Sequence, residues 1–174
     1  LMPAAARADE ASARLRRLLL AERQPGLAAV VVQDAAVGAR AVAGHADAAR
    51  QRPVEARTVF ELGSVTKALT ALLVLGLRDE GRLELDAPVA RYVDDLPAPW
   101  RSVTLRQLLS HTSGIPNYLD AGNFIGLMPT SPRPRTLLGM VAGRPMDFAP
   151  GTRHAYSNTN YILAGLAVER AAGM

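Results

Sequence analysis

Residues 60–67 read Phe-Glu-Leu-Gly-Ser-Val-Thr-Lys and lead into an apolar segment. Lys67 is the only lysine among the 20 basic residues of the chain. Arginine stays protonated, whereas a lysine amine can lose its proton when its surroundings lower its pKa. Ser64 precedes Lys67 by three residues, and residues three apart share one face of a helix. The spacing predicts a hydroxyl beside its own base. The alternative is that the single lysine stands at this offset by chance.

The segment that follows predicts a helix over residues 64–80, which Gly81 ends. This helix is apolar nearly all round, so we expect it to be buried in the core. Ser64 would lie at its N-terminus, where backbone N–H groups and the helix dipole favour negative charge. The same positive end, together with burial, would favour the neutral form of Lys67.

The first part of the chain predicts one helix and one hairpin. Residues 9–23 form an amphipathic pattern that ends before Pro25-Gly26. The residues at helical spacing are Ala11, Leu15, Leu18, Leu19 and Glu22. Two short runs, 27–32 and 37–44, predict the strands of a hairpin, although Asp34-Ala35-Ala36 is a poor turn signal. Residues 46–58 are polar and mixed, and are expected to form a loop.

The rest of the chain predicts short helices around a long loop. Residues 103–110 suit a helix with Thr104 as its N-cap. Residues 111–135 are rich in glycine and proline, and a loop of that length in a compact domain is usually functional or covers a site. Residues 136–142 suit a short helix, and residues 158–172 a final one.

Composition limits the classes of protein that fit. The 174 residues, 49% hydrophobic and 21% charged, indicate a helix-rich globular domain or part of a larger one. Aromatic residues make up only 5% and the arginines are scattered, which argues against nucleic-acid binding. There is no cysteine, and three scattered histidines predict no metal site. The longest apolar stretch is too short to span a bilayer. The opening Leu-Met-Pro-Ala-Ala-Ala lacks the regions of a signal peptide and is typical of an engineered end or of a mature terminus left by processing.

A second group of residues stands about ninety positions after Ser64 and gives the chain its likeness to a known family. Residues 148–161 read Phe-Ala-Pro-Gly-Thr-Arg-His-Ala-Tyr-Ser-Asn-Thr-Asn-Tyr. Ser64-Val65-Thr66-Lys67 matches an S-x-x-K motif, and Tyr156-Ser157-Asn158 matches Y-x-N. With the stretches 79–89 and 104–114 between them, the chain from about residue 10 to its end resembles the serine β-lactamase and D-alanyl-D-alanine carboxypeptidase superfamily. The likeness is to its class C β-lactamase, DD-peptidase and esterase branch.

The resemblance implies an α+β fold of the β-lactamase/DD-peptidase type, an antiparallel sheet flanked by helices plus a mostly helical domain. Residues 1–59 would supply the N-terminal helix and hairpin of the α/β region. Residues 60–174 would form the mostly helical region that carries both motifs. The family's third motif, Lys-Thr-Gly or His-x-Gly, has no match after Tyr156, and family members extend well beyond this point. The resemblance therefore implies that the C-terminal strands of the sheet are missing from this chain and are supplied by a second polypeptide or a partner copy.

The implied chemistry is that of a serine hydrolase acting through an acyl-enzyme on a β-lactam, a D-alanyl peptide or an ester. Ser64 would be the nucleophile and Lys67 its base. Tyr156 would be a second proton carrier. Asn158 would hold the lysine and bind an amide of the substrate. The resemblance implies no cofactor, and a periplasmic or secreted protein.

Other interpretations of these residues remain open. Taken alone, Tyr156 and Asn158 suit a packing tyrosine and an N-cap asparagine, and it is their pairing with the S-x-x-K motif that favours catalysis. His111 beside Ser113 suggests a catalytic triad, but no Gly-x-Ser-x-Gly motif surrounds Ser64 or Ser113. The family that the chain resembles uses the segment around His111 as a structural turn. His154 is near enough in sequence to Tyr156 to tune the site but suits a loop surface.

His45 suits a structural role. At the level of the whole protein, the alternative to a hydrolase is a penicillin- or peptide-binding module that does not turn over, or an inactive fragment of the hydrolase.

Overall fold

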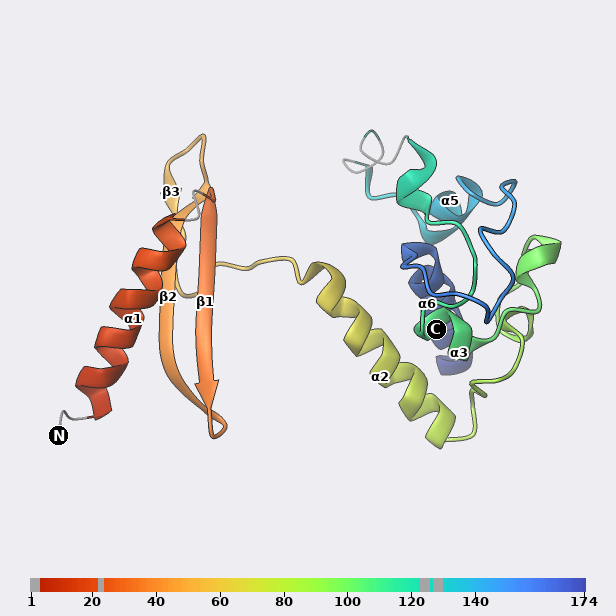
Figure 1. The fold of residues 1–174 in the computed structure, drawn as a ribbon, viewed down its shortest axis with the longest axis horizontal. Helices are drawn as coiled ribbons and strands as arrows, with labels where there is room; N and C mark the ends of the chain where they lie inside the picture. Colours follow the sequence, from red (N-terminus) through yellow and green to blue (C-terminus); the bar gives the residue numbers. More distant parts are fainter. Residues whose placement is uncertain (1–3, 22–23, 123–125, 127–129) are drawn as a thin grey trace. The chain divides into compact units, whose positions relative to one another are not determined.

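The structure, a computed structural model, describes residues 4–21, 24–122, 126 and 130–174. These residues fall into two compact units, Leu1–Glu61 and Leu62–Met174. The first unit contains an antiparallel sheet, and the second contains helices (Figure 1). An antiparallel sheet with separate helices is the α+β class that the sequence predicts. Within the described residues, no helix combines the length and the apolar character needed to cross a bilayer.

The first unit is one helix packed on three strands. Helix α1 (Ala4–Ala21) lies along the sheet formed in the order β1 (Gly26–Gln33), β2 (Ala36–Asp47) and β3 (Arg52–Pro53), as Figure 1 shows. Alternate residues of one face of β2 are buried, as period-2 alternation requires. They are all alanines: Ala39, Ala41 and Ala43.

The apolar face of α1 differs from the one that helical spacing predicted. Leu15 and Leu19 are half-buried, as two residues four apart on one face should be. Leu18 is 58% exposed and Ala11 is exposed too, so neither belongs to that face as expected. The reason is that the sheet covers only a narrow stripe of the helix. Residues 22–23, with the predicted Glu22, lie outside the described residues.

The hairpin forms where it was predicted, through a turn that the sequence signals poorly. Asp34 and Ala35 have φ angles of 50° and 61°, the left-handed values that a two-residue hairpin turn needs. Glycine or asparagine usually takes such positions, which explains the weak signal. The expected loop over residues 46–58 is partly wrong, because β3 pairs there with the end of β2. A two-residue strand that includes a proline has no periodicity to read.

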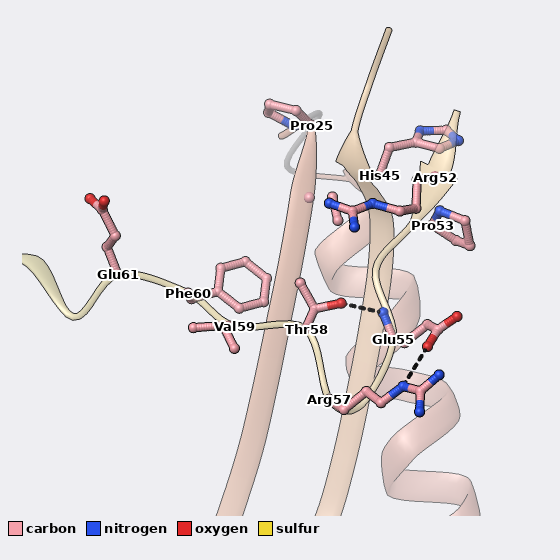
Figure 2. A pocket seen from close by; sticks show the side chains of 12 residues that line it. Pro25, His45, Arg52, Pro53, Glu55, Arg57, Thr58, Val59, Phe60 and Glu61 are labelled. Carbon is pink, nitrogen blue, oxygen red and sulfur yellow. Dashed lines mark hydrogen bonds and ion pairs between the residues drawn. The ribbon is translucent and has the colours of Figure 1, made fainter. Parts of the chain in front are cut away.

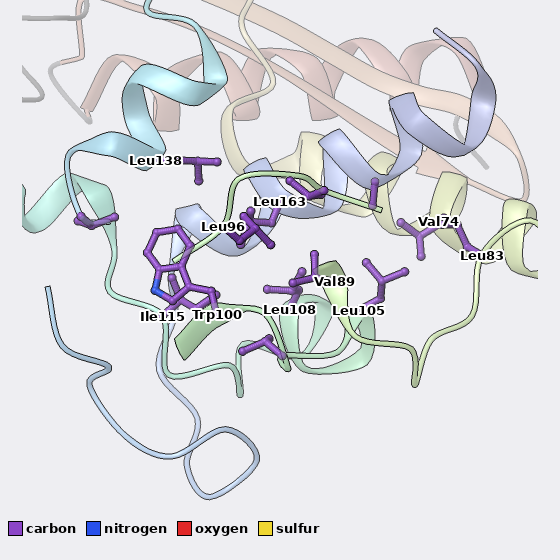
Figure 3. Close-up of a cluster of buried hydrophobic side chains, with 14 of the residues drawn as sticks. Val74, Leu83, Val89, Leu96, Trp100, Leu105, Leu108, Ile115, Leu138 and Leu163 are labelled. Carbon is purple, nitrogen blue, oxygen red and sulfur yellow. The ribbon is translucent and has the colours of Figure 1, made fainter. Parts of the chain in front are cut away.

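The second unit is a set of helices around a core that includes Trp100 (Figure 3). A 3-10 turn, η1 (Gly63–Val65), leads into α2 (Thr66–Asp79). Helix α6 (Asn158–Ala172) packs against α2 and also against α3 (Leu105–Leu109). Other elements among the described residues of this unit are η2 (Val89–Arg91), η3 (Ala98–Trp100), η4 (Tyr118–Ala121) and α5 (Pro134–Gly139).

Three of the predicted helices of this unit match the structure closely. Helix α6 has the predicted bounds. Helix α3 begins after Thr104, whose side chain accepts from the Gln107 N–H while the Gln107 side chain accepts from the Thr104 N–H. This reciprocal capping box confirms the predicted N-cap. Helix α5 begins at Pro134, two residues before the predicted start at 136, and ends at Gly139, three residues before the predicted end at 142.

Helix α2 is less buried than its apolar sequence predicted. Only Val74 and Leu77 are buried. One side of the helix instead exposes Leu69, Leu72 and Leu73, at 49%, 64% and 57%. The expectation of a buried helix is therefore wrong for the described residues, since α6 covers one face of α2 and leaves the other open. A sequence that is apolar all round cannot say which face finds a partner.

Within the described part of the long loop predicted over residues 111–135, the structure has η4, the start of α5 and helical positions at residues 126 and 130. The loop's residues 123–125 and 127–129 lie outside the described residues. The loop begins with a turn in which Gly114 has a φ of 74°, and a Cβ there would lie 2.0 Å from the Phe148 carbonyl oxygen. Only glycine suits that position, and the close approach joins the loop to the segment that precedes Tyr156.

Candidate active site

Ser64 and Lys67 are brought together by the junction of η1 and α2. Ser64 lies in the 3-10 turn, and Lys67 lies in the first turn of the α-helix that continues it. The Lys67 Nζ donates to Ser64 Oγ at 3.3 Å. Ser64 is exposed and Lys67 is half-buried. The three-residue spacing thus gives the contact between hydroxyl and amine that the sequence predicts.

Tyr156 and Asn158 reach the same place from the start of α6. The Tyr156 hydroxyl and Ser64 Oγ are hydrogen-bonded at 2.8 Å. The Lys67 Nζ donates to Asn158 Oδ1 at 2.8 Å. The packing of α6 against α2 is what closes the long separation in sequence. All four predicted site residues therefore lie in one hydrogen-bonded group within the second unit.

Asn158 has its amide orientation fixed by a residue that the sequence did not single out. Asn117 Oδ1 accepts from both the backbone N–H and the Nδ2 of Asn158, at 3.0 and 3.2 Å. The amide nitrogen therefore points at Asn117 and the amide oxygen points at Lys67. Asn158 is not the N-cap of α6, because Ser157 holds that position. Nothing in the sequence signals Asn117 except the proline before it, since its partner is 41 residues away.

The phenol of Tyr156 is set up to lose its proton more readily than an ordinary tyrosine. The neighbouring Lys67 amine, and next the hydrogen bond with Ser64, hold the pKa of Tyr156 below its usual value, against a small opposing effect of burial. The Lys67 Nζ lies 5.0 Å from the centre of the phenol ring. Tyr156 is 49% exposed, so solvent screens part of this effect. Ser64 Oγ thus has two possible proton acceptors within hydrogen-bond distance.

His111 and Ser113 do not form a triad with each other. Ser113 is 1% exposed, and its hydroxyl donates to Asn160 Oδ1 at 2.6 Å. A hydroxyl that is buried and hydrogen-bonded in this way is inaccessible to a substrate. His111 is 9% exposed, and its ring lies 4.4 Å from that of Tyr156. The structure thus places His111 beside the predicted site, which sequence reasoning did not foresee.

The other two histidines take no part in this group of residues. His154 is exposed, with its ring 6.0 Å from that of His111 and edge-on to it. His45 is half-buried in β2 of the first unit, where its backbone N–H donates to the Pro25 carbonyl. Among the described residues, no three His, Cys, Asp or Glu side chains are placed to hold a metal ion.

The first unit has a cavity of its own, of about 830 Å³. Figure 2 shows His45, Arg52 and Glu55 around it, together with the chain from Arg57 to Glu61. Its polar groups are largely occupied, because Arg57 pairs with Glu55 at 3.2 Å and the Thr58 hydroxyl accepts from the Glu55 N–H at 2.8 Å. None of the four predicted site residues lines it, and its charged side chains are exposed. The hydrogen-bonded group in the second unit is the better candidate for chemistry.

Comparison with known proteins gives a family for this fold and site. The family model described as Beta-lactamase matches residues 10–174. Esterase EstB of Burkholderia gladioli is 35% identical over 186 aligned residues, which cover 99% of this chain and 47% of the esterase. Penicillin-binding protein 4* of Bacillus subtilis is 33% identical over 133 residues, which cover 75% of this chain and 29% of that protein.

Solved structures agree with these relatives. The crystal structure of a D-stereospecific amidohydrolase from a Streptomyces species matches with a TM-score of 0.76 and 29% identity. The match covers 95% of this chain and 50% of that one. The chain thus spans about half the length of these relatives or less, and the fold that it shares with them is that of the β-lactamases and DD-peptidases.

Proposed function

The chain belongs to the beta-lactamase family, and we propose that its protein is a serine hydrolase that works through an acyl-enzyme on Ser64. One observation carries the proposal. Ser64 Oγ is hydrogen-bonded both to the Tyr156 hydroxyl at 2.8 Å and to the Lys67 amine at 3.3 Å. A serine with a base in contact and a second proton carrier beside it is the arrangement that nucleophilic catalysis needs.

The proposed reaction gives a chemical step to Ser64, Lys67 and Tyr156. Ser64 Oγ attacks the carbonyl carbon of the substrate while Lys67, in its neutral form, takes the hydroxyl proton. The negative charge that develops on the carbonyl oxygen is favoured by the start of α2, where backbone N–H groups point outward. Tyr156 passes its phenol proton to the leaving nitrogen or oxygen as that bond breaks and the acyl-enzyme forms, and the proton held by Lys67 then moves to Tyr156. In deacylation water loses a proton to Lys67 and attacks the ester, and that proton returns to Ser64 Oγ as the acid leaves.

Lys67 and Tyr156 compete for the role of base. Tyr156 OH lies nearer to Ser64 Oγ, and its pKa is below that of an ordinary tyrosine. Lys67 is held by Asn158, whose amide oxygen accepts one of the ammonium or amine hydrogens. We favour Lys67 as the base because its amine contacts both the Ser64 hydroxyl and Asn158, and Tyr156 as the group that gives a proton to the leaving atom.

The substrate class that we propose is an amide, lactam or ester carbonyl. Support comes from the relatives, which are named as an esterase, a penicillin-binding protein and a D-stereospecific amidohydrolase. A panel of a chromogenic cephalosporin, a p-nitrophenyl ester and a D-amino acid amide would rank the three. Asn158 is proposed to contact the substrate as well as Lys67; its place in the Tyr156-Ser157-Asn158 motif and its hydrogen bond with Lys67 support this.

A second candidate is a binding module that is acylated by a lactam or binds a peptide without turning it over. The specific observation behind it is that one of the relatives reported above is named as a penicillin-binding protein. Pre-steady-state kinetics separate the two functions. A burst of product without subsequent turnover fits the binding module, and continued release of product fits the hydrolase.

The proposal is tested by covalent labelling of Ser64. The full-length polypeptide is treated with a fluorophosphonate or a penicillin and then analysed by intact mass and peptide mapping. We expect one label, on Ser64, and none in Ser64→Ala. Ser110→Ala is a matched control, because Ser110 is exposed but bonds to its own helix and to Thr112. Label on Ser113, or no label with either reagent at high concentration, would reject the assignment.

Two further proposals concern the setting of the protein. We propose that it works in the periplasm or outside the cell; the family resemblance and the lack of cysteine support this, and cell fractionation would test it. We also propose that the open edge of β1 and the open face of α2 are covered by polypeptide that this chain does not include, or by a partner copy. The exposed valines of β1 and leucines of α2 support that proposal.

A further inference from the structure

His111 makes three contacts with the chain immediately around Tyr156. Its backbone carbonyl accepts from the Ala155 N–H at 3.0 Å. Its ring Nδ1 accepts from the Ser157 N–H at 3.2 Å. Its ring lies against the phenol of Tyr156, with centroids 4.4 Å apart and planes tilted by 33°. One buried residue therefore holds the residue before Tyr156, the residue after it, and the Tyr156 side chain.

These contacts determine which ring nitrogen carries the proton. A backbone N–H can only donate, so Nδ1 of His111 must present a lone pair to Ser157. The neutral ring then carries its proton on Nε2. Asn160 lies at 3.3 Å from the same Nδ1, and must turn its amide nitrogen toward it. Its Oδ1 is then free to accept from the Ser113 hydroxyl at 2.6 Å, and that hydroxyl accepts from the Ile115 N–H at 3.0 Å.

The backbone of His111 is adapted to this task. Its φ of 56° lies in the left-handed region, which bulky residues rarely adopt and in which histidine, asparagine and aspartate are enriched. This conformation lets one residue present both its carbonyl and its ring to the strand-like segment that enters α6. A conformation of this kind persists where the surrounding contacts fix it, and it often marks a functional site.

We propose that neutral His111 is a positioning residue for Tyr156: it fixes the backbone on both sides of Tyr156 and supports the phenol against Ser64. The inference rests on the proposed function, since it assigns a means of aligning the proton carrier of that reaction. His111 touches neither Ser64 nor Lys67 by a hydrogen bond in the described structure, so its action is through Tyr156.

The charges around His111 favour the form of the ring that the proposal needs. Tyr156 and His154 face it from the segment before α6, Tyr161 from α6 and Lys67 from α2. Burial, and then the charges of His154 and Lys67, hold the pKa of His111 below its ordinary value. Protonation would turn Nδ1 into a donor facing two donors, and would release the segment that carries Tyr156.

The test compares two variants of the full-length polypeptide. One keeps the hydrogen-bond acceptor of His111 and the other keeps its aromatic ring. His111→Asn keeps an acceptor near the place of Nδ1 and tolerates a positive φ, but lacks the ring. His111→Phe keeps the ring but cannot accept from Ser157. Misplacing a catalytic group by about 1 Å can cost on the order of a hundredfold in rate. We expect His111→Phe to lower the Ser64 acylation rate constant by at least tenfold, by this reasoning, and His111→Asn to recover most of it.

Binding should be affected less than the chemical step. KM for the best chromogenic substrate should change by less than about threefold in both variants, because His111 is only 9% exposed and so offers a substrate little surface to contact. His45→Asn, at a histidine of the first unit, is the matched control and should stay within about twofold of the parent rate, a difference too small to indicate a catalytic contribution. Equal loss in His111→Phe and His111→Asn, or no loss in either, would overturn the proposal.

Two spectroscopic measurements test the inference without any turnover. Nitrogen-15 NMR of the histidine rings should show His111 protonated at Nε2 and bare at Nδ1. Absorbance titration should show the pKa of the Tyr156 phenol higher in His111→Phe than in the parent, because the phenol loses its alignment with Lys67 and Ser64. A proton on Nδ1, or an unchanged phenol titration, would contradict the proposal. If Ser64 is never labelled, the proposed function fails, and these two measurements still decide the role of His111.

Discussion

At the scale of single residues, two groups of the site can accept the proton of the Ser64 hydroxyl. Ser64 Oγ is in contact with an amine and with a phenol, and each has its own support: Asn158 holds Lys67, and His111 lies against Tyr156. Arginine would keep the positive charge at position 67 but cannot become a base at any ordinary pH. The identity of the base is therefore open to a direct test.

Lys67→Arg should abolish acylation of Ser64 while leaving the fold nearly intact. The variant retains a cation beside Asn158 and Tyr156. It removes the amine that could act as a base, because arginine stays protonated. Acylation is measured by the rate of fluorophosphonate labelling, and folding by circular dichroism. A variant that keeps more than about a tenth of the parent rate, a loss of less than about 1.4 kcal/mol of barrier, would show that Lys67 is not the base.

The contact between Ser64 and Lys67 could be predicted from helical spacing, whereas Tyr156 and Asn158 were singled out by their match to a family motif. Helical geometry places Ser64 against Lys67, and the start of α6 keeps Tyr156 close to Asn158. The residues that orient them could not be found in that way. Asn117 reaches Asn158 across 41 residues, and His111 reaches Ser157 across 46. Such contacts depend on how a loop packs against a helix, which periodicity does not encode.

At the scale of elements, α3 and the turn after it determine where His111 lies. The helix has only five residues, so its ends matter more than its interior. Its N-terminus is fixed by the capping box of Thr104 and Gln107. Past its C-terminus, the Thr112 N–H donates to the Gln107 carbonyl, which links the same glutamine to the turn that contains His111.

Thr104→Ala should destabilise the second unit by about 1 kcal/mol, because it leaves the Gln107 N–H without its acceptor. Thr104→Ser keeps the hydroxyl and should stay within a few tenths of a kcal/mol of the parent, about the spread seen among good caps. Trp100, the single tryptophan, lies in the core of this unit and reports its unfolding by fluorescence in denaturant. Equal stability of the alanine and serine variants would mean that the capping box does not hold α3.

Elements with a local signal were predicted well, and those that depend on partners were not. The N-cap at Thr104 and the bounds of α6 follow from residues within a few positions of each other. The strand β3 has two residues, and it is a strand only because it pairs with the end of β2. The exposed face of α2 was missed for a related reason, since burial is a property of the neighbour as much as of the helix.

At the scale of the whole molecule, both units expose apolar surface of the kind that proteins usually cover. In the first unit, β1 pairs only with β2 in the described structure, and its valines Val30, Val31 and Val32 are 58%, 50% and 59% exposed. An unpaired edge of this kind is a template for another strand. In the second unit, the open side of α2 presents three leucines. Large apolar patches usually mark an interface or a liability to aggregate.

We therefore expect the 174-residue chain by itself to self-associate or to be poorly soluble. Sedimentation velocity over a range of concentrations, together with thermal melting, measures this. Val32→Lys in β1 and Leu72→Gln in α2 each remove one exposed apolar side chain and should lower the degree of association. Gln33→Lys adds the same charge as Val32→Lys at the neighbouring exposed position of β1 without removing apolar surface. If it acts as strongly, net charge rather than the apolar surface is responsible. A soluble parent chain that is monomeric at all concentrations and melts cooperatively would show that these surfaces need no cover, and that the core of each unit is sufficient as it stands.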